Sequence, residues 1–102
     1  MYRLTQAAEA DIEAILTQSF SQFGALQTER YFDSLRACLE LLAENPSMGT
    51  SAEKIRAGYR RFSHQSHVIF YLKEPAGILI VRLLHFRMNA IGHLLNDANE
   101  PE

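Results

Sequence analysis

The residues that could do chemistry are concentrated in YRRFSHQSHVIFY, residues 59–71, where two arginines and two histidines lie among aromatic side chains. RNA cleavage without a metal ion needs a base for the 2′-hydroxyl, an acid for the leaving oxygen and cations for the charge that develops at phosphorus. Together with neighbouring segments, this stretch could supply all three. The candidate ribonuclease residues are His85, Arg82, Arg61, Lys54 and His64.

The same stretch also has the pattern of a structural β-hairpin. Phe62, Val68 and either Phe70 or Ile69 would then be buried in the core. A histidine at a strand end, such as His85, usually has a satisfied hydrogen bond rather than a catalytic role. Because the chain carries a net charge of −2, and proteins that bind RNA usually carry net positive charge, we favour the structural interpretation.

The motif H-x-x-H at His64 and His67 is the only pattern that suggests a metal site. On one strand, residues three apart point to opposite faces, so sharing a metal ion would require a turn between them. The sequence has no C-x-x-C or H-E-x-x-H motif and no glycine-rich phosphate loop. We therefore expect neither a metal ion nor any other cofactor.

Length and composition predict one globular domain. The chain has 102 residues, of which 47% are hydrophobic and 22% charged. The single cysteine, Cys38, excludes an internal disulfide and fits a reducing compartment. The first residues lack the pattern of a signal peptide, and no apolar run approaches the roughly 20 residues that span a bilayer. We therefore expect a cytoplasmic protein.

The charges are unevenly distributed along the chain. Residues 1–53 contain three arginines and eight acidic residues, whereas residues 54–87 contain seven basic residues and one acidic residue. Residues 88–102 contain three acidic residues and no Lys or Arg. The basic segment could face a phosphate or an acidic protein partner, or its charges could solvate one face of a sheet.

The first half of the chain predicts a helical hairpin. Residues 2–5 are expected to form a short strand, and Thr5 to cap the helix that follows. Gly24 is expected to end this helix, because glycine takes positive φ without a Cβ clash. A second helix, residues 26–44, would stop before Pro46 and lie antiparallel to the first. The predicted apolar stripes are Ile12, Ile15, Leu16 and Phe23, and Tyr31, Leu35, Cys38 and Leu42.

The second half predicts three strands, at residues 55–63, 66–73 and 78–85. The order β-α-α-β-β-β predicts an α+β fold with the helical hairpin packed on an antiparallel sheet. The last strand is apolar on both faces and is therefore expected to be covered on both. Its predicted face sets are Ile78, Ile80 and Leu84 with Arg82, and Leu79, Val81 and Leu83 ending in His85. Either the segment after Met88 or a protein partner would cover the face away from the helices.

Several short segments, taken in order, resemble the ParE branch of the RelE/ParE toxins of bacterial type II toxin–antitoxin operons. The resemblance covers Tyr2 to Leu94, and its most specific parts are SHVIFY at residues 66–71 and IVRLLHFRM at residues 80–88. Two positions depart from the family pattern. Asn89 stands where aspartate is common, and Gln65 stands where glycine is common.

The resemblance implies one RelE/ParE-like domain at residues 1–95 and a short acidic tail at 96–102. It implies a toxin that poisons DNA gyrase by binding it, without catalysis or a cofactor, and that a ParD-like antitoxin encoded beside it neutralises. No membrane and no sequence-specific nucleic acid is expected as a partner. The alternatives are a RelE-like ribosome-dependent mRNA endonuclease and an inactive remnant that only binds its antitoxin. Phe86 follows His85, where a histidine–tyrosine pair would suit cleavage, and this favours gyrase over mRNA.

An antitoxin segment that is disordered alone, acidic and apolar would suit the basic half of this chain. Its carboxylates would pair with planar guanidinium groups. The residues expected to bind it are Arg56, Arg60, Arg61, Arg82 and Arg87.

Overall fold

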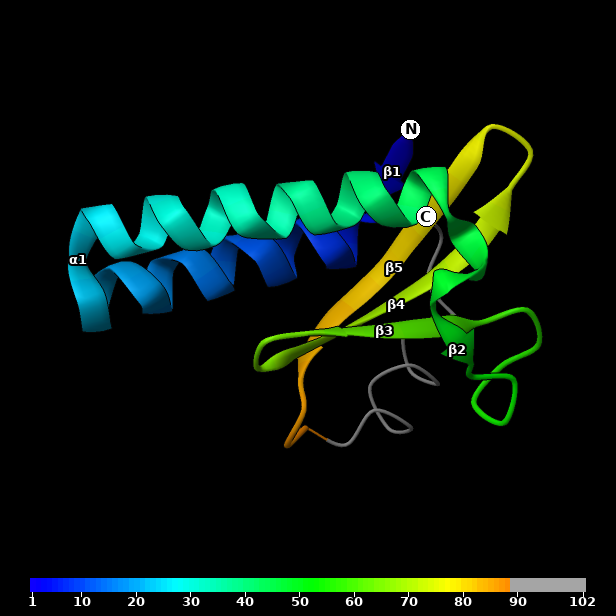
Figure 1. Cartoon of the computed structure of the whole chain (residues 1–102). Helices are drawn as coiled ribbons and strands as arrows, with labels where there is room; N and C mark the ends of the chain where they lie inside the picture. The colour runs from blue at the N-terminus through cyan, green and yellow to red at the C-terminus, as the bar shows by residue number, and fades with distance from the viewer. Residues whose placement is uncertain (89–102) are drawn as a thin grey trace.

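The computed structural model describes residues 1–88 of the chain. Five strands form one sheet in the order β1-β5-β4-β3-β2, and the long helix α1 covers one face of it (Figure 1). The elements are β1 (Tyr2–Leu4), α1 (Gln6–Glu44), the 3-10 helix η1 (Pro46–Met48), β2 (Thr50–Ser51), β3 (Arg60–His64), β4 (His67–Glu74) and β5 (Gly77–His85). This confirms the predicted α+β architecture. The expectations for Asn89, for the segment after Met88 and for the boundary at residue 96 lie outside the described residues.

Helix α1 is a hairpin of two helical arms, as the sequence predicts. The chain reverses at Gly24, whose φ of 83° and ψ of −178° are not helical, and the two arms run antiparallel (Figure 1). Thr5 caps the first arm, because its hydroxyl oxygen accepts a hydrogen bond of 3.0 Å from the Ala8 N–H. The second arm ends at Asn45, the residue before Pro46, where the α conformation is disfavoured.

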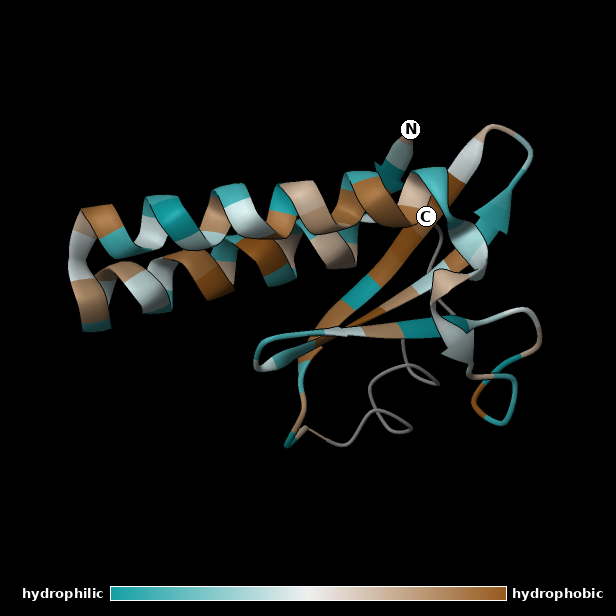
Figure 2. Cartoon of the chain, in the orientation of Figure 1, coloured by the Kyte–Doolittle hydropathy of each residue, from teal (hydrophilic) through white to brown (hydrophobic). Residues whose placement is uncertain are grey.

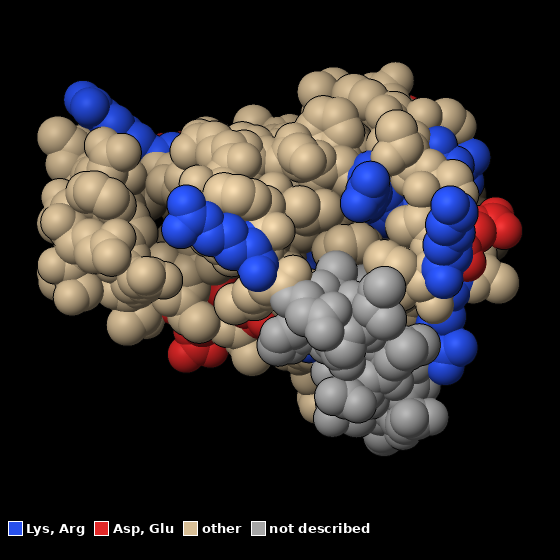
Figure 3. Space-filling view, turned by 90° about the horizontal axis from the view of Figure 1, so that it is seen from below, with Lys and Arg blue, Asp and Glu red and all other residues tan. Residues whose placement is uncertain are grey.

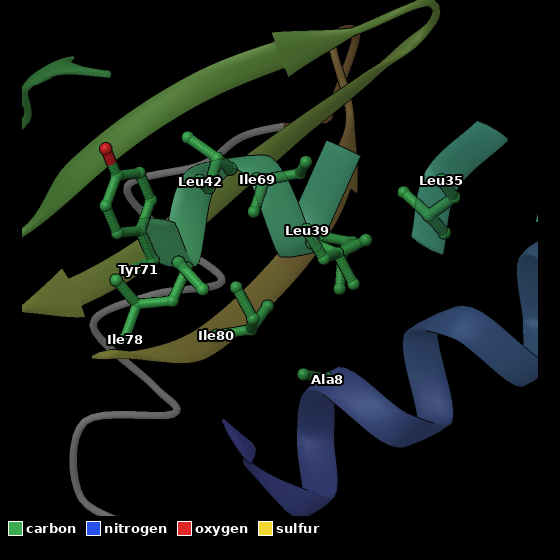
Figure 4. Packing of buried hydrophobic residues seen from close by; sticks show 10 residues of the cluster. Ala8, Leu35, Leu39, Leu42, Ile69, Tyr71, Ile78 and Ile80 are labelled. Carbon is green, nitrogen blue, oxygen red and sulfur yellow. The ribbon is translucent and has the colours of Figure 1, made fainter. Parts of the chain in front are cut away.

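The main core lies between the hairpin and the sheet, and the second arm contributes most of its helical side chains (Figure 4). Its buried residues are Ala8, Leu35, Leu39, Leu42, Ala43, Ile69, Tyr71, Ile78, Ile80 and Leu83. The prediction that Phe23 belongs to this core is wrong, since its side chain is 65% exposed. The end of the hairpin around Gly24 extends beyond the sheet and has no strand to pack on, although it is partly apolar (Figures 1 and 2).

The sheet is mixed rather than purely antiparallel. Strands β2, β3, β4 and β5 pair antiparallel, but β1 runs parallel to β5, with Tyr2 opposite Ile78. Thr5 explains the direction, because its backbone N–H donates to the Ile80 carbonyl at 3.1 Å and its hydroxyl to the Val81 carbonyl at 2.7 Å. The chain therefore continues alongside β5 as it enters α1.

The predicted strand at residues 55–63 begins later, at Arg60. Residues 52–59 form a looped segment closed by a hydrogen bond of 2.8 Å from the Ala52 N–H to the Tyr59 carbonyl, and Gly58, at φ 84°, interrupts the extended backbone. Ala52 and Tyr59 are buried against the sheet face away from the helices, with Ile55 packed beside them. The loop thus covers part of the sheet face away from the helices, which the sequence analysis expected the segment after Met88 or a protein partner to cover.

A β-bulge changes the predicted faces of β5. The pairing of β4 with β5 shifts between Phe70, which lies opposite Arg82, and Tyr71, which lies opposite Ile80. Val81 is therefore an extra residue, and one extra residue inverts the alternation beyond it. As a result, Leu83 joins the core under the helices and Leu84 joins the opposite face, the reverse of the prediction.

Leu35→Ala should lower the free energy of unfolding by about 2–5 kcal/mol, because the side chain is 1% exposed and its loss leaves a cavity. Leu41→Ala is the matched control on the same arm, because Leu41 is 48% exposed. This substitution should lower the free energy of unfolding by well under about 1 kcal/mol, as most surface changes do. Urea denaturation of both variants measures the difference. Equal losses would show that the second arm is not packed as described.

Candidate functional site

Three histidines form a row across the end of the sheet. His67 on β4 lies opposite His64 on β3 and opposite His85 on β5. The rings of His67 and His85 are 5.7 Å apart and nearly perpendicular. The sequence analysis required a turn between His64 and His67 for the two to share a face, and the structure has that turn at Gln65–Ser66. The two residues are therefore direct cross-strand neighbours on one face.

The second arm of α1 closes over this row with two side chains three residues apart on one helix face. The Tyr31 hydroxyl is 2.9 Å from Nδ1 of His67, and the Ser34 hydroxyl is 2.8 Å from Nε2 of His64. The Tyr31 ring lies 5.8 Å from the His64 ring and 6.0 Å from the His67 ring. These contacts tie the hairpin to the turn between β3 and β4.

Burial changes the titration of two histidines of the row, His64 and His67. Burial lowers the pKa of His67, and the neighbouring His85 and His64 lower it further against a weaker opposing effect of Asp11. Burial also lowers the pKa of His64. Burial, together with Cys38, raises the pKa of Tyr31, so its hydroxyl stays protonated. His64, His67 and Tyr31 are therefore neutral hydrogen-bonding groups at pH 7.

An ion pair between α1 and β5 lies beside the row. The Arg82 guanidinium donates from Nε to Asp11 Oδ2 at 2.6 Å and from Nη2 to Oδ1 at 2.8 Å. Both side chains are mostly buried, at 13% and 14% exposure. The Leu83 N–H donates to the same carboxylate at 3.0 Å. Arg82 is therefore held against α1 by a bidentate pair whose carboxylate also satisfies the sheet backbone.

A cleft of about 350 Å³ separates the far part of the hairpin from the histidine row, and we call it the hairpin cleft. Its described lining contains no Lys, Arg, Asp or Glu. The lining residues are Ile15, Gln18, Ser19, Gln22, Phe23, Gln27, Tyr31, Gln65, Ser66, His67 and His85.

The structure does not bring the whole predicted ribonuclease set together. His64 and His85 lie in the row, and Arg82 lies beside it in its pair with Asp11. Arg61 follows the alternation of β3 onto the opposite face, in register with Phe70. Lys54 belongs to the loop at residues 52–59.

The predicted antitoxin-binding arginines differ in their accessibility. Arg60 donates to the Ser47 carbonyl at 3.2 Å and to the Gly49 carbonyl, so it fixes the loop before β2. Arg82 is the partner of Asp11. Arg56, Arg61 and Arg87 are exposed, with the Arg87 guanidinium 5.4 Å from the centre of the Phe86 ring.

Residues 1–88 contain no feature that would indicate a metal site or a membrane-spanning helix. No group of three or more His, Cys, Asp or Glu side chains in this range could hold a metal ion. None of its helices is long and apolar enough to cross a membrane.

Two residues of this site were missed by sequence reasoning. The sequence analysis gave Asp11 no role and assigned Tyr31 only to the core stripe, yet both contact the groups around the row. The sequence did offer one indication for Asp11, because it is next to Ile12, a residue of the apolar stripe that faces the sheet. Nothing in the sequence indicated its partner, because Arg82 is 71 positions away.

The fold is that of a solved chromosomal ParDE toxin–antitoxin system from P. aeruginosa. The likeness has a TM-score of 0.70 at 16% identity and covers 82% of this chain and 92% of that chain. At this identity the comparison shows the shared fold alone.

Sequence comparison gives the family. A profile described as "ParE toxin of type II toxin-antitoxin system, parDE" matches residues 2–90. Toxin ParE1 of Caulobacter vibrioides is 44% identical over 93 residues, which cover 91% of this chain and 96% of that protein. Toxin ParE1 of Mycobacterium tuberculosis is 37% identical over 89 residues, covering 86% and 91%. The chain belongs to the ParE toxin family of type II toxin–antitoxin systems.

The lowered pKa values of His64 and His67 predict a loss of stability in acid. Unfolding restores their ordinary pKa of about 6.5, so below that pH the unfolded chain binds more protons than the folded one. The free energy of unfolding should have its full value above a pH of about 6.5. It should fall as the pH decreases toward the pKa values of the two histidines in the folded protein. In His67→Gln this decrease should be shallower, as urea titrations from pH of about 7.5 to 5 would measure. Parallel curves for the parent and the variant would contradict the assignment.

Gln65 predicts a second effect on stability. It is the only described non-glycine residue with positive φ, at 53°, and it is the first residue of a two-residue hairpin turn, where glycine is often preferred. Gln65→Gly should raise the free energy of unfolding by about 1 kcal/mol, whereas Gln65→Val should lower it by a similar amount. Thermal unfolding of the pair checks the sign, and two changes in the same direction would contradict it.

Proposed function

We propose that this chain is a toxin that binds DNA gyrase in the bacterial cytoplasm and that an antitoxin encoded beside it neutralises it. The match to the ParE family over residues 2–90 carries the proposal. Relatives named as ParE toxins, at 31% to 44% identity, support it.

Binding rather than catalysis is the proposed mode of action. A ribonuclease needs a cation close to its acid and base, to stabilise charge at phosphorus. Here Arg82, the arginine next to the histidine row, is neutralised by Asp11, and Arg61 lies on the opposite face. None of the cations in the predicted ribonuclease set, Arg82, Arg61 and Lys54, therefore supplies an uncompensated positive charge at the row.

For the antitoxin we propose an acidic segment that docks on the exposed arginines of the second half. Figure 3 shows several Lys and Arg side chains gathered at the sheet end of one face. Arg56, Arg61 and Arg87 have exposed side chains. Arg60 and Arg82 serve internal contacts, so the proposed electrostatic contact rests mainly on the other three.

The gyrase proposal is tested with the purified protein in two parallel assays. With gyrase and supercoiled plasmid, cleaved DNA should accumulate in a gyrase-dependent manner, and with translating ribosomes mRNA should remain intact. Failure to affect gyrase at any protein concentration would remove the proposed target.

The antitoxin proposal is tested by charge reversal. Arg56→Glu combined with Arg61→Glu should weaken the complex with the neighbouring gene product by about tenfold or more, because like charges would then face each other. Arg30→Glu is the matched control, an exposed arginine on α1 outside the basic half. Calorimetric titration measures the affinities, and equal effects of the two variants would contradict the proposed surface.

Ribosome-dependent mRNA cleavage is the second candidate, favoured by the three histidines beside a cleft. His67 is neutral at pH 7 and bonded to Tyr31, as a general base would be. If the parent cleaves mRNA on ribosomes and a folded His67→Ala variant does not, this candidate replaces gyrase binding. If the parent shows neither activity but binds the neighbouring product, the chain is an inactive remnant.

A further inference from the structure

The fold collects the glutamines of this chain around one cleft. The sequence contains five, and Gln18, Gln22, Gln27 and Gln65 line the hairpin cleft. They come from the first arm of α1, the second arm and the turn between β3 and β4, so tertiary structure brings them together. Each carboxamide offers both a hydrogen-bond donor and an acceptor. The cleft therefore has a rim that can match a ligand carrying both.

The lining of the cleft also includes an imidazole with a defined proton, that of His85. The backbone N–H of Arg87 donates to Nδ1 of His85 at 3.1 Å, so in neutral His85 the proton is on Nε2. No hydrogen bond among the described residues uses that Nε2–H. His67 and Tyr31, which are hydrogen-bonded to each other, also line the cleft.

The shape and charge of the cleft limit the class of ligand. Because no described lining residue is charged, an ionic group placed inside would lose hydration without gaining an opposite charge. A volume of about 350 Å³ holds one small ring system. Aromatic side chains are available in the lining, since both Tyr31 and Phe23 belong to it and Phe23 is 65% exposed. Flat neutral rings stack on such side chains.

We propose that the hairpin cleft binds a nucleobase and favours adenine. A glutamine carboxamide can pair with adenine through two hydrogen bonds, to N6 and N7, while the ring stacks on an aromatic side chain. Arg87 follows two residues after His85 with an exposed side chain, and it would bond the phosphate attached to the base outside the cleft. The proposal does not rest on the proposed gyrase activity.

NMR titration of the isotope-labelled protein with AMP, adenosine and CMP tests the proposal. AMP should shift the side-chain amide signals of the four cleft glutamines, bind more tightly than CMP, and bind more tightly than adenosine. Gln22→Leu should weaken AMP binding by about tenfold, the loss expected for one bidentate pair. Gln6→Leu, which alters the one glutamine outside the cleft, should leave the affinity unchanged. Arg87→Ala should remove the difference between AMP and adenosine.

The source of the base is distinguished by a second ligand. Binding of single-stranded oligoadenylate more tightly than AMP would assign the site to an unpaired base of a nucleic acid, and equal or weaker binding would assign it to a free nucleotide. If none of these ligands shifts the cleft signals at about 10 mM, any binding is weaker than millimolar and the proposal is overturned. Equal affinities of Gln22→Leu and Gln6→Leu would also overturn it, and neither result would affect the gyrase assay.

Discussion

Strand β5 sets the requirement that the rest of the fold satisfies, because it is buried on both faces and its backbone needs hydrogen-bond partners along both edges. β4 pairs with one edge along its whole length, but β1 pairs with the other only from Ile78 to Ile80. Beyond that point the beginning of α1 takes over, through Thr5 at the Val81 carbonyl and Asp11 at the Leu83 N–H. A buried backbone group left without a partner costs about 1–3 kcal/mol, so this end of the helix is firmly placed.

The placement of α1 then determines the site. Asp11, held by the sheet backbone, also compensates the charge of Arg82, which would otherwise be mostly buried without a counter-ion. The first arm runs out beyond the sheet, Gly24 reverses the chain, and the second arm returns with Tyr31 and Ser34 over the histidine row. The cleft under the hairpin follows from the same geometry, because the arms extend beyond the sheet (Figure 1).

Features with local causes could be predicted from the sequence, and features that depend on strand register could not. The Thr5 cap and the reversal at Gly24 follow from side-chain oxygen chemistry and from the freedom of glycine, which act within a few residues. The bulge at Val81 and the pairing of His67 with both His64 and His85 depend on how the strands align, and the bulge reverses the facing of the residues beyond it. For that reason the site's histidines were identified but their common face was not.

The pairing at the start of α1 also has a consequence for timing during synthesis. Thr5 and Val81 are 76 positions apart, so at the usual 5–20 residues per second the ribosome needs about 4–15 s to make the second after the first. Within that interval the second arm of the hairpin is made before β4 and β5, the strands that cover Leu35, Leu39 and Leu42. Contacts of such long range form slowly and only once the whole chain is present. The nascent toxin is therefore without its histidine row until translation is nearly finished, and its uncovered helical stripe is accessible to chaperones and proteases before then.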